Sequence, residues 1–231
     1  MKNYEFLLFD FDGTLVDYNK TEAWNLAATF RAAGLAYDKD IHFAAYQPIN
    51  LRLWREFERG KISAERLRVQ RFEEFFAVCG IQGDAHSIAG AYIENQGNAA
   101  FLFDDAISVL ETLRPRYKMG IITNGLKEIQ RKRLTLTGVD KYFDNITVSD
   151  EIGVQKPEAG IFEHCFRVAG HTDKTTALII GDSFSADVMG GLNFGIDACW
   201  FNPTGDTPSG NGPGATYEIH SLKELPALLG I

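Results

Sequence analysis

The sequence predicts an α/β fold, in which a Rossmann-like parallel sheet is flanked by helices and an all-helical domain is inserted. In the C-terminal part of the chain, short apolar runs alternate with amphipathic helical stretches, which is typical of a parallel sheet covered by helices. Another apolar run near the N-terminus is separated from these by residues 17–98, which have helical spacing and no convincing strand pattern. Because a single strand cannot form a sheet, the first strand belongs with the later ones. The predicted core domain is therefore residues 1–16 and 99–231, and the inserted helical domain is residues 17–98.

Each element is predicted from its local pattern. The first strand lies within residues 4–16 and enters a turn at Gly13. Residues 17–98 are rich in Ala, Leu, Phe, Arg and Glu, and glycines at possible helix ends divide them into about four helices. The later strands are predicted from apolar runs at 118–125, 145–153, 176–183 and 196–202. Helices are predicted at 126–137, 157–169, 185–194 and 222–229. The stretch 203–214, rich in glycine and proline, is predicted to be a mobile surface loop.

Composition excludes several classes of function. The chain has 231 residues, with 23 Lys and Arg against 31 Asp and Glu, so its net charge is −8. This acidic balance argues against binding a nucleic acid polymer, although one local pocket can still hold a small anion. The three cysteines have no metal-ligand spacing and fit reduced thiols. No run approaches the ~20 apolar residues of a membrane span, so we expect a cytoplasmic protein without membrane contact.

Reactive side chains follow several of the predicted strands. Asp10 and Asp12 end the first apolar run, in the stretch "FLLFDFDGTLV". The other groups at strand ends are Thr123 with Asn124, Lys156 and Asp182. The carboxyl ends of parallel strands meet at one edge of a sheet, where ligands bind, so we expect these groups to lie close together. Three carboxylates in one place would repel one another unless a cation lay among them, and oxygen ligands with open positions suit Mg²⁺.

Four motifs on these residues give the chain a family resemblance. The stretches "DFDGTL" (10–15), "ITNG" (122–125), "KP" (156–157) and "GDSFSAD" (181–187) resemble, in order, the motifs of the haloacid dehalogenase-like phosphatase superfamily. The insertion after the first motif matches the helical cap of its C1 class. More finely, "YQPINLRLWREFERGKIS" (46–63), "GIITNG", "EIGVQKP" and "GGLNFGIDACWFN" resemble the noncanonical pyrimidine 5′-nucleotidase branch.

The resemblance implies a role for each motif residue. Asp10 would be the nucleophile that forms an aspartyl-phosphate, and Asp12 the general acid and then the base. If the strand is still extended at Asp12, the spacing of two lets both carboxylates reach one phosphoryl group. Mg²⁺ would be held by the Asp10 carboxylate, the backbone carbonyl of Asp12 and the Asp182 carboxylate. The groups expected to contact the substrate or its phosphate are Asp10, Gly13, Thr123, Asn124, Gly125, Lys156, Tyr46 and Asn50. Thr14 would hydrogen-bond within its loop, and Asp187 would orient Lys156 or a metal-bound water.

The resulting expectation is a Mg²⁺-dependent phosphomonoester hydrolase that acts on a small phosphorylated metabolite. By resemblance, the substrate is a pyrimidine or modified nucleoside 5′-monophosphate, whose base could contact Tyr46, Asn50 or Trp54 in the cap; for Trp54, packing within the cap is at least as good an explanation. A phosphatase or mutase of small sugar phosphates such as phosphoglycolate stays open. A haloacid dehalogenase fits poorly, since such enzymes of this fold lack the second aspartate and use no metal. A phosphonate-cleaving enzyme would need a cap lysine in a setting not recognised here, and a non-catalytic binding protein should have lost one of the motif residues.

Overall fold

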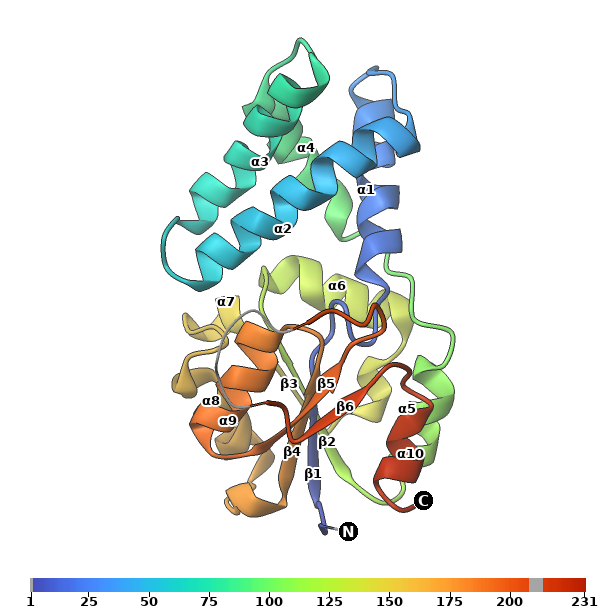
Figure 1. Cartoon of the computed structure of the whole chain (residues 1–231), viewed down its shortest axis with the longest axis vertical. Coiled ribbons are helices and arrows are strands. Elements are labelled where there is room, and N and C mark those ends of the chain that lie inside the picture. Colours follow the sequence, from blue (N-terminus) through green and yellow to red (C-terminus); the bar gives the residue numbers. More distant parts are fainter. Residues whose placement is uncertain (1, 208–213) are drawn as a thin grey trace. The chain divides into compact units, whose positions relative to one another are not determined.

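The computed structural model describes residues 2–207 and 214–231, apart from the side chain of Glu58. Most of the predicted surface loop at 203–214 therefore lies outside the described residues. The chain divides into two compact units. The first, here called the α/β unit, consists of residues 1–18 and 100–231, and the second, the helical unit, consists of residues 19–99 (Figure 1).

The described part of the α/β unit contains a six-stranded sheet in which every paired neighbour is parallel. Its strands are β1 (Phe6–Phe9), β2 (Lys118–Thr123), β3 (Asn145–Val148), β4 (Ala177–Gly181), β5 (Asp197–Phe201) and β6 (Tyr217–Ile219). The strand order is β3-β2-β1-β4-β5-β6. The chain thus runs outward from β1 to β3 and then crosses to the other side of β1, so the order reverses next to β1. Ligands of open α/β sheets bind at such a switch point, outside the carboxyl ends of the strands.

Alternation along β1 explains why the sheet is covered on both faces. Phe6 and Leu8 pack in one apolar cluster, with side chains of α8 (Ala159–Ala169) and α9 (Met189–Phe194), whereas Leu7 and Phe9 pack in a second cluster on the opposite face. All four side chains are fully buried. A strand that is apolar on both faces needs helices on both faces. Figure 1 shows α8 and α9 on one side of the sheet, and α5 (Ala106–Leu113) and α10 (Glu224–Leu228) on the other.

Along the chain, the helices of the α/β unit precede β2, lie between β2 and β5, or follow β6. They are α5 (Ala106–Leu113), α6 (Lys127–Thr137), α7 (Ser149–Ile152), α8 (Ala159–Ala169), α9 (Met189–Phe194) and α10 (Glu224–Leu228). Short 3₁₀ turns lie at Asp140–Tyr142 and Lys174–Thr176, and a π-helical turn at Phe184–Val188 leads into α9.

The helical unit has its own apolar core. Its elements are α1 (Tyr18–Ala32), a π-helical turn (Lys39–Phe43), α2 (Ala44–Glu58), α3 (Ala64–Cys79) and α4 (Ala85–Gln96). Aromatic side chains dominate its centre, where Tyr46 of α2 packs against Phe72 and Phe75 of α3 and Tyr92 of α4. Side-chain oxygens of Ser63 and Asp84 accept hydrogen bonds from the first turns of α3 and α4, which fixes where these helices begin.

The predicted fold class is confirmed, with three local differences. The run 145–153 is not one strand, because β3 ends at Val148 and α7 begins at Ser149. The edge strand β6 was not predicted, since only three residues pair and they follow a stretch rich in glycine and proline. Helix α5 was also not predicted, although four buried residues at helical spacing on it pack into the core.

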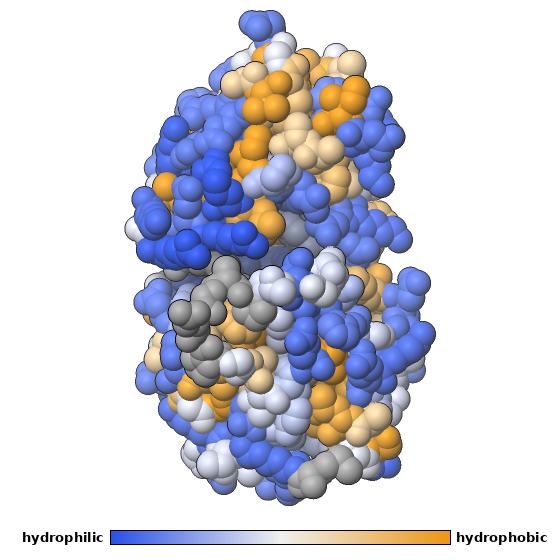
Figure 2. Space-filling view, viewed as in Figure 1, coloured by the Kyte–Doolittle hydropathy of each residue, from blue (hydrophilic) through white to orange (hydrophobic). Residues whose placement is uncertain are grey.

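Hydrophobic side chains in the described residues form no membrane-spanning helix, and those that are exposed are scattered. No helix in the described ranges is both long and apolar enough to cross a bilayer. Figure 2 shows hydrophobic residues in patches among hydrophilic ones on the face in view. The large exposed hydrophobic side chains of the described residues each lie on a different element: Trp24, Ile41, Leu51, Val78, Leu136 and Val168. Scattered residues of this kind are normal on a protein surface.

Candidate active site

Three carboxylates gather at the carboxyl edge of the sheet, next to the switch in strand order. Asp10 follows β1, Asp182 follows β4, and Asp187 lies in the π-helical turn after β4. One oxygen of each lies within 4.8 Å of the others, close enough to share a metal ion. The parallel register explains the meeting, because Phe9 pairs with Ile180 and the next residues along each strand are Asp10 and Gly181. These three residues are called the acidic cluster below.

Lys156 provides the positive charge of the acidic cluster. Its Nζ donates to Asp10 Oδ1 and to Asp187 Oδ1, at 2.6 Å in both cases, and its side chain is 2% exposed. The second oxygen of Asp187 accepts from the backbone N–H of Ser183 at 3.0 Å. Asp187 therefore holds the lysine, one of the two roles expected for it, and all of these groups lie in the α/β unit.

Burial and mutual repulsion dominate the electrostatics of the acidic cluster. Burial raises the pKa of Asp10 to about 7, although the neighbouring Lys156 opposes the shift. Burial, followed by the charges of Asp10 and Asp187, raises the pKa of Asp182 well above its ordinary value. Burial by itself would lower the pKa of Lys156, but the charges of Asp10 and Asp187 raise it above the ordinary lysine value. The cluster holds more negative charge than one lysine offsets, which fits the binding of Mg²⁺ to its carboxylate oxygens.

The loop after β1 brings its backbone against Asp182. Gly13 has φ +88°, and a Cβ there would collide with the Asp182 carboxylate. The buried Thr14 donates its hydroxyl to Asp182 Oδ1 at 3.4 Å, rather than bonding only within its own loop as expected. A Cβ on Gly181 would likewise collide with Asp187. The small residues at these two positions therefore allow the acidic cluster to form.

Asp12 is not a member of the acidic cluster. Its predicted position beside Asp10 assumed that the strand is still extended at Asp12, but β1 ends at Phe9 and a tight loop follows. This loop is closed by hydrogen bonds from the Gly13 N–H to the Val16 carbonyl and from the Val16 N–H to the Phe11 carbonyl. The alternation of side chains along a strand therefore does not apply at Asp12. Its carboxylate lies instead against α6, where Arg133 and Gln130 bind it. Neither helix residue was predicted as part of the site.

Thr123, Asn124 and Gly125 follow β2 and have distinct partners. The Thr123 hydroxyl oxygen is buried and accepts from Gln130 Nε2 at 2.7 Å. The Asn124 side chain donates to the Lys156 carbonyl at 3.0 Å and accepts from the Lys156 N–H at 2.9 Å, so it fixes the backbone of the lysine. Gly125 was expected among the residues that contact the substrate or its phosphate, and in the structure its N–H donates to Ser149 Oγ at 3.1 Å.

The two predicted cap contacts belong to the helical unit. The Tyr46 ring is fully buried among the aromatic side chains described above. Asn50 is 2% exposed, donates to Glu22 and accepts from Arg71 at 3.3 Å. Their contact with a substrate stays a prediction, and this packing does not support it. Trp54 is half-buried, and its ring packs edge-to-face against that of Phe57 on the same helix.

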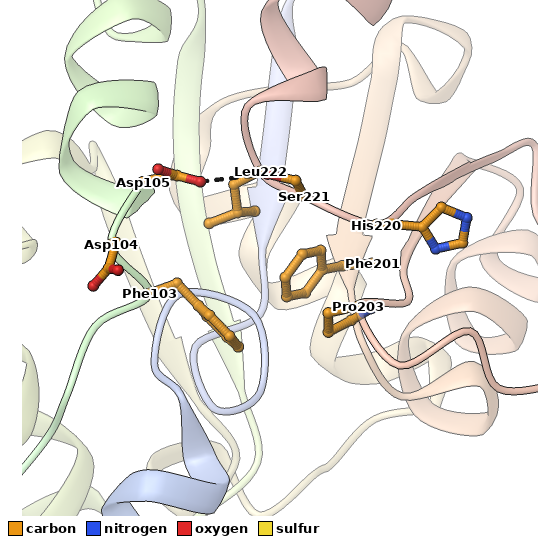
Figure 3. Close-up of a pocket in the computed structure, with 8 residues that line it drawn as sticks. All are labelled: Phe103, Asp104, Asp105, Phe201, Pro203, His220, Ser221 and Leu222. Carbon is orange, nitrogen blue, oxygen red and sulfur yellow. Dashed lines mark hydrogen bonds between the residues drawn. The ribbon is translucent and has the colours of Figure 1, made fainter.

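A pocket elsewhere in the α/β unit is not this site. It has a volume of about 180 Å³ and is lined by Phe103, Phe201 and His220 among others, none of which belongs to the acidic cluster (Figure 3). Asp105 at its edge accepts from Ser221 Oγ at 3.3 Å. His220 Nδ1 lies 2.6 Å from the Asn202 carbonyl, so a backbone group already engages this ring.

Comparison with known proteins places the chain in a family. A sequence model of the haloacid dehalogenase-like hydrolases matches residues 4–195. The chain belongs to this hydrolase family, which confirms the resemblance seen in the four motifs.

Individual relatives match along almost their whole length. The HAD-hydrolase YfnB of Bacillus subtilis is 35% identical over 231 residues, covering 100% of this chain and 97% of that protein. A crystal structure of YfnB, described as bound to magnesium and as revealing interdomain movement, superposes with a TM-score of 0.93 at 34% identity and covers 100% of both chains. The pyrimidine 5′-nucleotidase YjjG of Escherichia coli is 32% identical, covering 98% of both proteins. The pyrimidine 5′-nucleotidase PynA of Streptococcus pneumoniae is 34% identical, covering 96% of this chain and 93% of that protein.

Proposed function

We propose that this protein hydrolyses small phosphate monoesters through a phosphorylated Asp10, and that its substrates are pyrimidine nucleoside 5′-monophosphates. The observation that carries the proposal is the acidic cluster around Lys156, built at the sheet edge where α/β proteins bind ligands. A phosphoryl group there would meet a carboxylate nucleophile, an ammonium group and a hydroxyl donor, the parts that phosphoryl transfer needs.

In the first step, Asp10 attacks phosphorus. One of its carboxylate oxygens forms a bond to phosphorus as the bond from phosphorus to the leaving oxygen breaks, giving an aspartyl-phosphate and an alkoxide. Asp10 must be ionised to attack, and the Lys156 ammonium 2.6 Å away favours its charged form. Lys156 and the Thr123 hydroxyl would bind phosphoryl oxygens and offset their negative charge.

Asp12 serves both halves of the reaction. As a general acid it gives a proton to the leaving alkoxide, which departs as an alcohol. As a base it then takes a proton from the water that attacks phosphorus, so that inorganic phosphate leaves and Asp10 is restored. Both oxygens of Asp12 accept hydrogen bonds from Arg133 in this structure, and one of them would also contact the leaving group when substrate is bound.

The acidic cluster is also the proposed metal site. The carboxylates of Asp10 and Asp182, with the backbone carbonyl of Asp12, would hold Mg²⁺. When bound, the ion neutralises charge on the phosphoryl oxygens and favours the ionised form of the buried carboxylates. Asp187, which holds Lys156, would stay outside this ligand set. The raised pKa values of Asp10 and Asp182 support the assignment, because both mark negative charge that the protein alone does not compensate.

The leaving group would be recognised outside the motif residues. We propose that residues 17–98 act as a cap domain, which selects the leaving group and excludes water during the reaction. The substrate class rests on YjjG and PynA, whose names describe pyrimidine 5′-nucleotidases and which match nearly the full chain.

A panel of phosphate monoesters with and without Mg²⁺ tests this function. We expect Mg²⁺-dependent hydrolysis of para-nitrophenyl phosphate, and a preference for UMP and dUMP over purine nucleotides and sugar phosphates in kcat/KM. Asp10→Asn should abolish turnover while the circular dichroism spectrum is unchanged. A sugar phosphate preferred at least about tenfold would overturn the nucleotide assignment. No turnover of any ester by the folded protein would overturn the phosphatase itself.

A further inference from the structure

We propose that Gln130 and Arg133 of α6 are positioning residues, which align the general acid Asp12 and the phosphate-binding hydroxyl of Thr123 with each other. The proposal rests on the proposed function and adds to it a part of the site that the four motifs do not contain. Gln130 and Arg133 are three residues apart, so they lie on the same face of α6, and both are buried.

Arg133 holds Asp12 with a two-point contact. Its Nη2 donates to Asp12 Oδ1 at 2.6 Å and its Nη1 to Asp12 Oδ2 at 2.9 Å. The planar guanidinium group matches a carboxylate in this geometry and restrains the plane of the carboxyl group as well as its place. The Arg133 side chain is 1% exposed, and its guanidinium lies over the Phe11 ring at 5.4 Å. An arginine packed in this way has little freedom to move, so the position of Asp12 is fixed from α6.

Gln130 joins this pair to Thr123. Its Nε2 donates to Asp12 Oδ2 at 2.9 Å and to Thr123 Oγ1 at 2.7 Å, which uses both of its amide hydrogens. Its Oε1 accepts from Arg133 Nη1 at 3.2 Å, which fixes which way the amide faces. The resulting network links Asp12, Gln130, Arg133 and Thr123, and each amide or guanidinium group in it faces a partner of the right kind.

The network has a direct consequence for the reacting groups. Since Thr123 Oγ1 accepts a hydrogen bond from Gln130, its own hydroxyl hydrogen stays available for another acceptor, such as a phosphoryl oxygen. Asp12 Oδ2 accepts two of the bonds described here, and Oδ1 accepts one, so Oδ1 retains the greater capacity to bond the leaving group. Misplacing a reacting group by about 1 Å can cost roughly a hundredfold in rate, so such alignment has a large effect on catalysis.

Dependence on the leaving group separates a positioning role from a structural one. A good leaving group such as 4-nitrophenolate needs little protonation, whereas phenolate from phenyl phosphate needs more help from the acid. The parameter kcat/KM reports steps through departure of the leaving group, so it excludes the later hydrolysis of phosphorylated Asp10. The wild type, Arg133→Met and Arg133→Lys are assayed on both esters, with melting curves to verify folding. If Arg133→Met does not fold, Arg133→Lys, which keeps the charge and loses the fork, carries the test.

We expect Arg133→Met to lower kcat/KM for phenyl phosphate about tenfold to a hundredfold more than for 4-nitrophenyl phosphate, and Arg133→Lys to have a smaller selective loss. The matched control is Arg131→Lys, because Arg131 on the same helix makes a two-point pair with Glu151 at 2.8 and 2.7 Å outside the site. It should show no selective loss. In an Asp12→Asn background, Arg133→Met should have no further selective effect, because both changes act on the same proton transfer.

Each outcome decides the proposal. An equal loss on both esters, or a selective loss that persists in the Asp12→Asn background, overturns the positioning role while the phosphatase stands. Absence of Mg²⁺-dependent turnover by the wild type overturns the proposed function, and the positioning role with it.

Discussion

Replacing Asp182 with asparagine tests the electrostatics of the acidic cluster without relying on activity. The amide keeps the size of the side chain and can still accept the hydrogen bond from Thr14, but it removes one negative charge. Two unit charges within 4.8 Å repel by about 3 kcal/mol at an effective dielectric constant of about 20. The Lys156 charge offsets part of this repulsion, and solvent screens some of the rest, because Asp182 is mostly but not fully buried. In buffer without divalent metal at pH 8, we therefore expect Asp182→Asn to be about 1–2 kcal/mol more stable than the wild type, a Tm difference of about 2–8 °C.

The stability difference should depend on pH in a defined direction. The pKa of Asp10 is raised from 3.8 to about 7 and that of Asp182 is also raised, so folding of the wild type is favoured when these groups are protonated. The contribution of Asp10 is complete below about pH 4 and is lost as the pH rises through about 7, and that of Asp182 is lost as the pH rises through its own raised pKa. Asp182→Asn lacks one of these groups and loses less. The difference in Tm between the two proteins should thus be close to zero near pH 4 and grow toward pH 7.

Magnesium should stabilise the wild type more than Asp182→Asn. A ligand at about 100 times its Kd stabilises the folded state by about 2.7 kcal/mol, and the wild type should show a Tm increase of this order. Asp182→Asn should gain less than half as much, because a charged ligand is missing. Differential scanning calorimetry with EDTA or MgCl₂ measures both effects, with Asp104→Asn, an exposed carboxylate of the same unit, as the control for net charge. Equal Mg²⁺ shifts in the wild type and Asp182→Asn, or a less stable Asp182→Asn protein at pH 8 without metal, would refute the reasoning.

Two further substitutions probe the same site. Gly13→Ala should lower the free energy of unfolding by more than about 1 kcal/mol and reduce the Mg²⁺-induced rise in Tm. The reason is that φ at Gly13 is +88° and the added Cβ would collide with the Asp182 carboxylate. An unchanged Mg²⁺ response in calorimetry would contradict this account of the loop. Asp187→Asn should lower kcat by about 10–100-fold, because Lys156 loses one of its two anionic partners. The variant should keep much of the Mg²⁺-induced rise in Tm. Full activity of the variant in steady-state kinetics at saturating Mg²⁺ would show that Asp187 does not support the lysine.

Much of the fold was predictable because its signals are local. The apolar runs that became β1, β2, β4 and β5 are buried on both faces, and this composition distinguishes them from the amphipathic helices between them. Elements with little burial of their own were missed: β6 pairs only three residues, and α7 is a single helical turn directly after β3. Their structure depends on neighbours that are distant in the sequence, so local patterns do not identify them.

The site, like the fold, has residues that local patterns predicted and residues that they did not. Asp10 and Asp182 could be placed together because each directly follows a strand at one edge of the sheet. Lys156 was predicted at the same edge as a residue just past a strand, although α7 separates it from β3. The orientation of Asp12 could not be predicted, because it depends on a loop that departs from strand geometry. Nor could its pairing with Arg133, because a contact across 121 positions of the sequence has no local signal. A residual signal did exist, since Gln130 and Arg133 are polar residues three apart in the helix that follows Thr123.

The measurement that bears most directly on the central claim is the location of the phosphoryl group during turnover. Wild-type protein mixed with UMP and Mg²⁺, quenched in acid and digested, should yield the peptide that contains Asp10 with the added mass of one phosphoryl group on that residue. The same peptide from Asp10→Asn should carry none. A phosphoryl group found on another side chain, or turnover that continues in Asp10→Asn, would contradict the account.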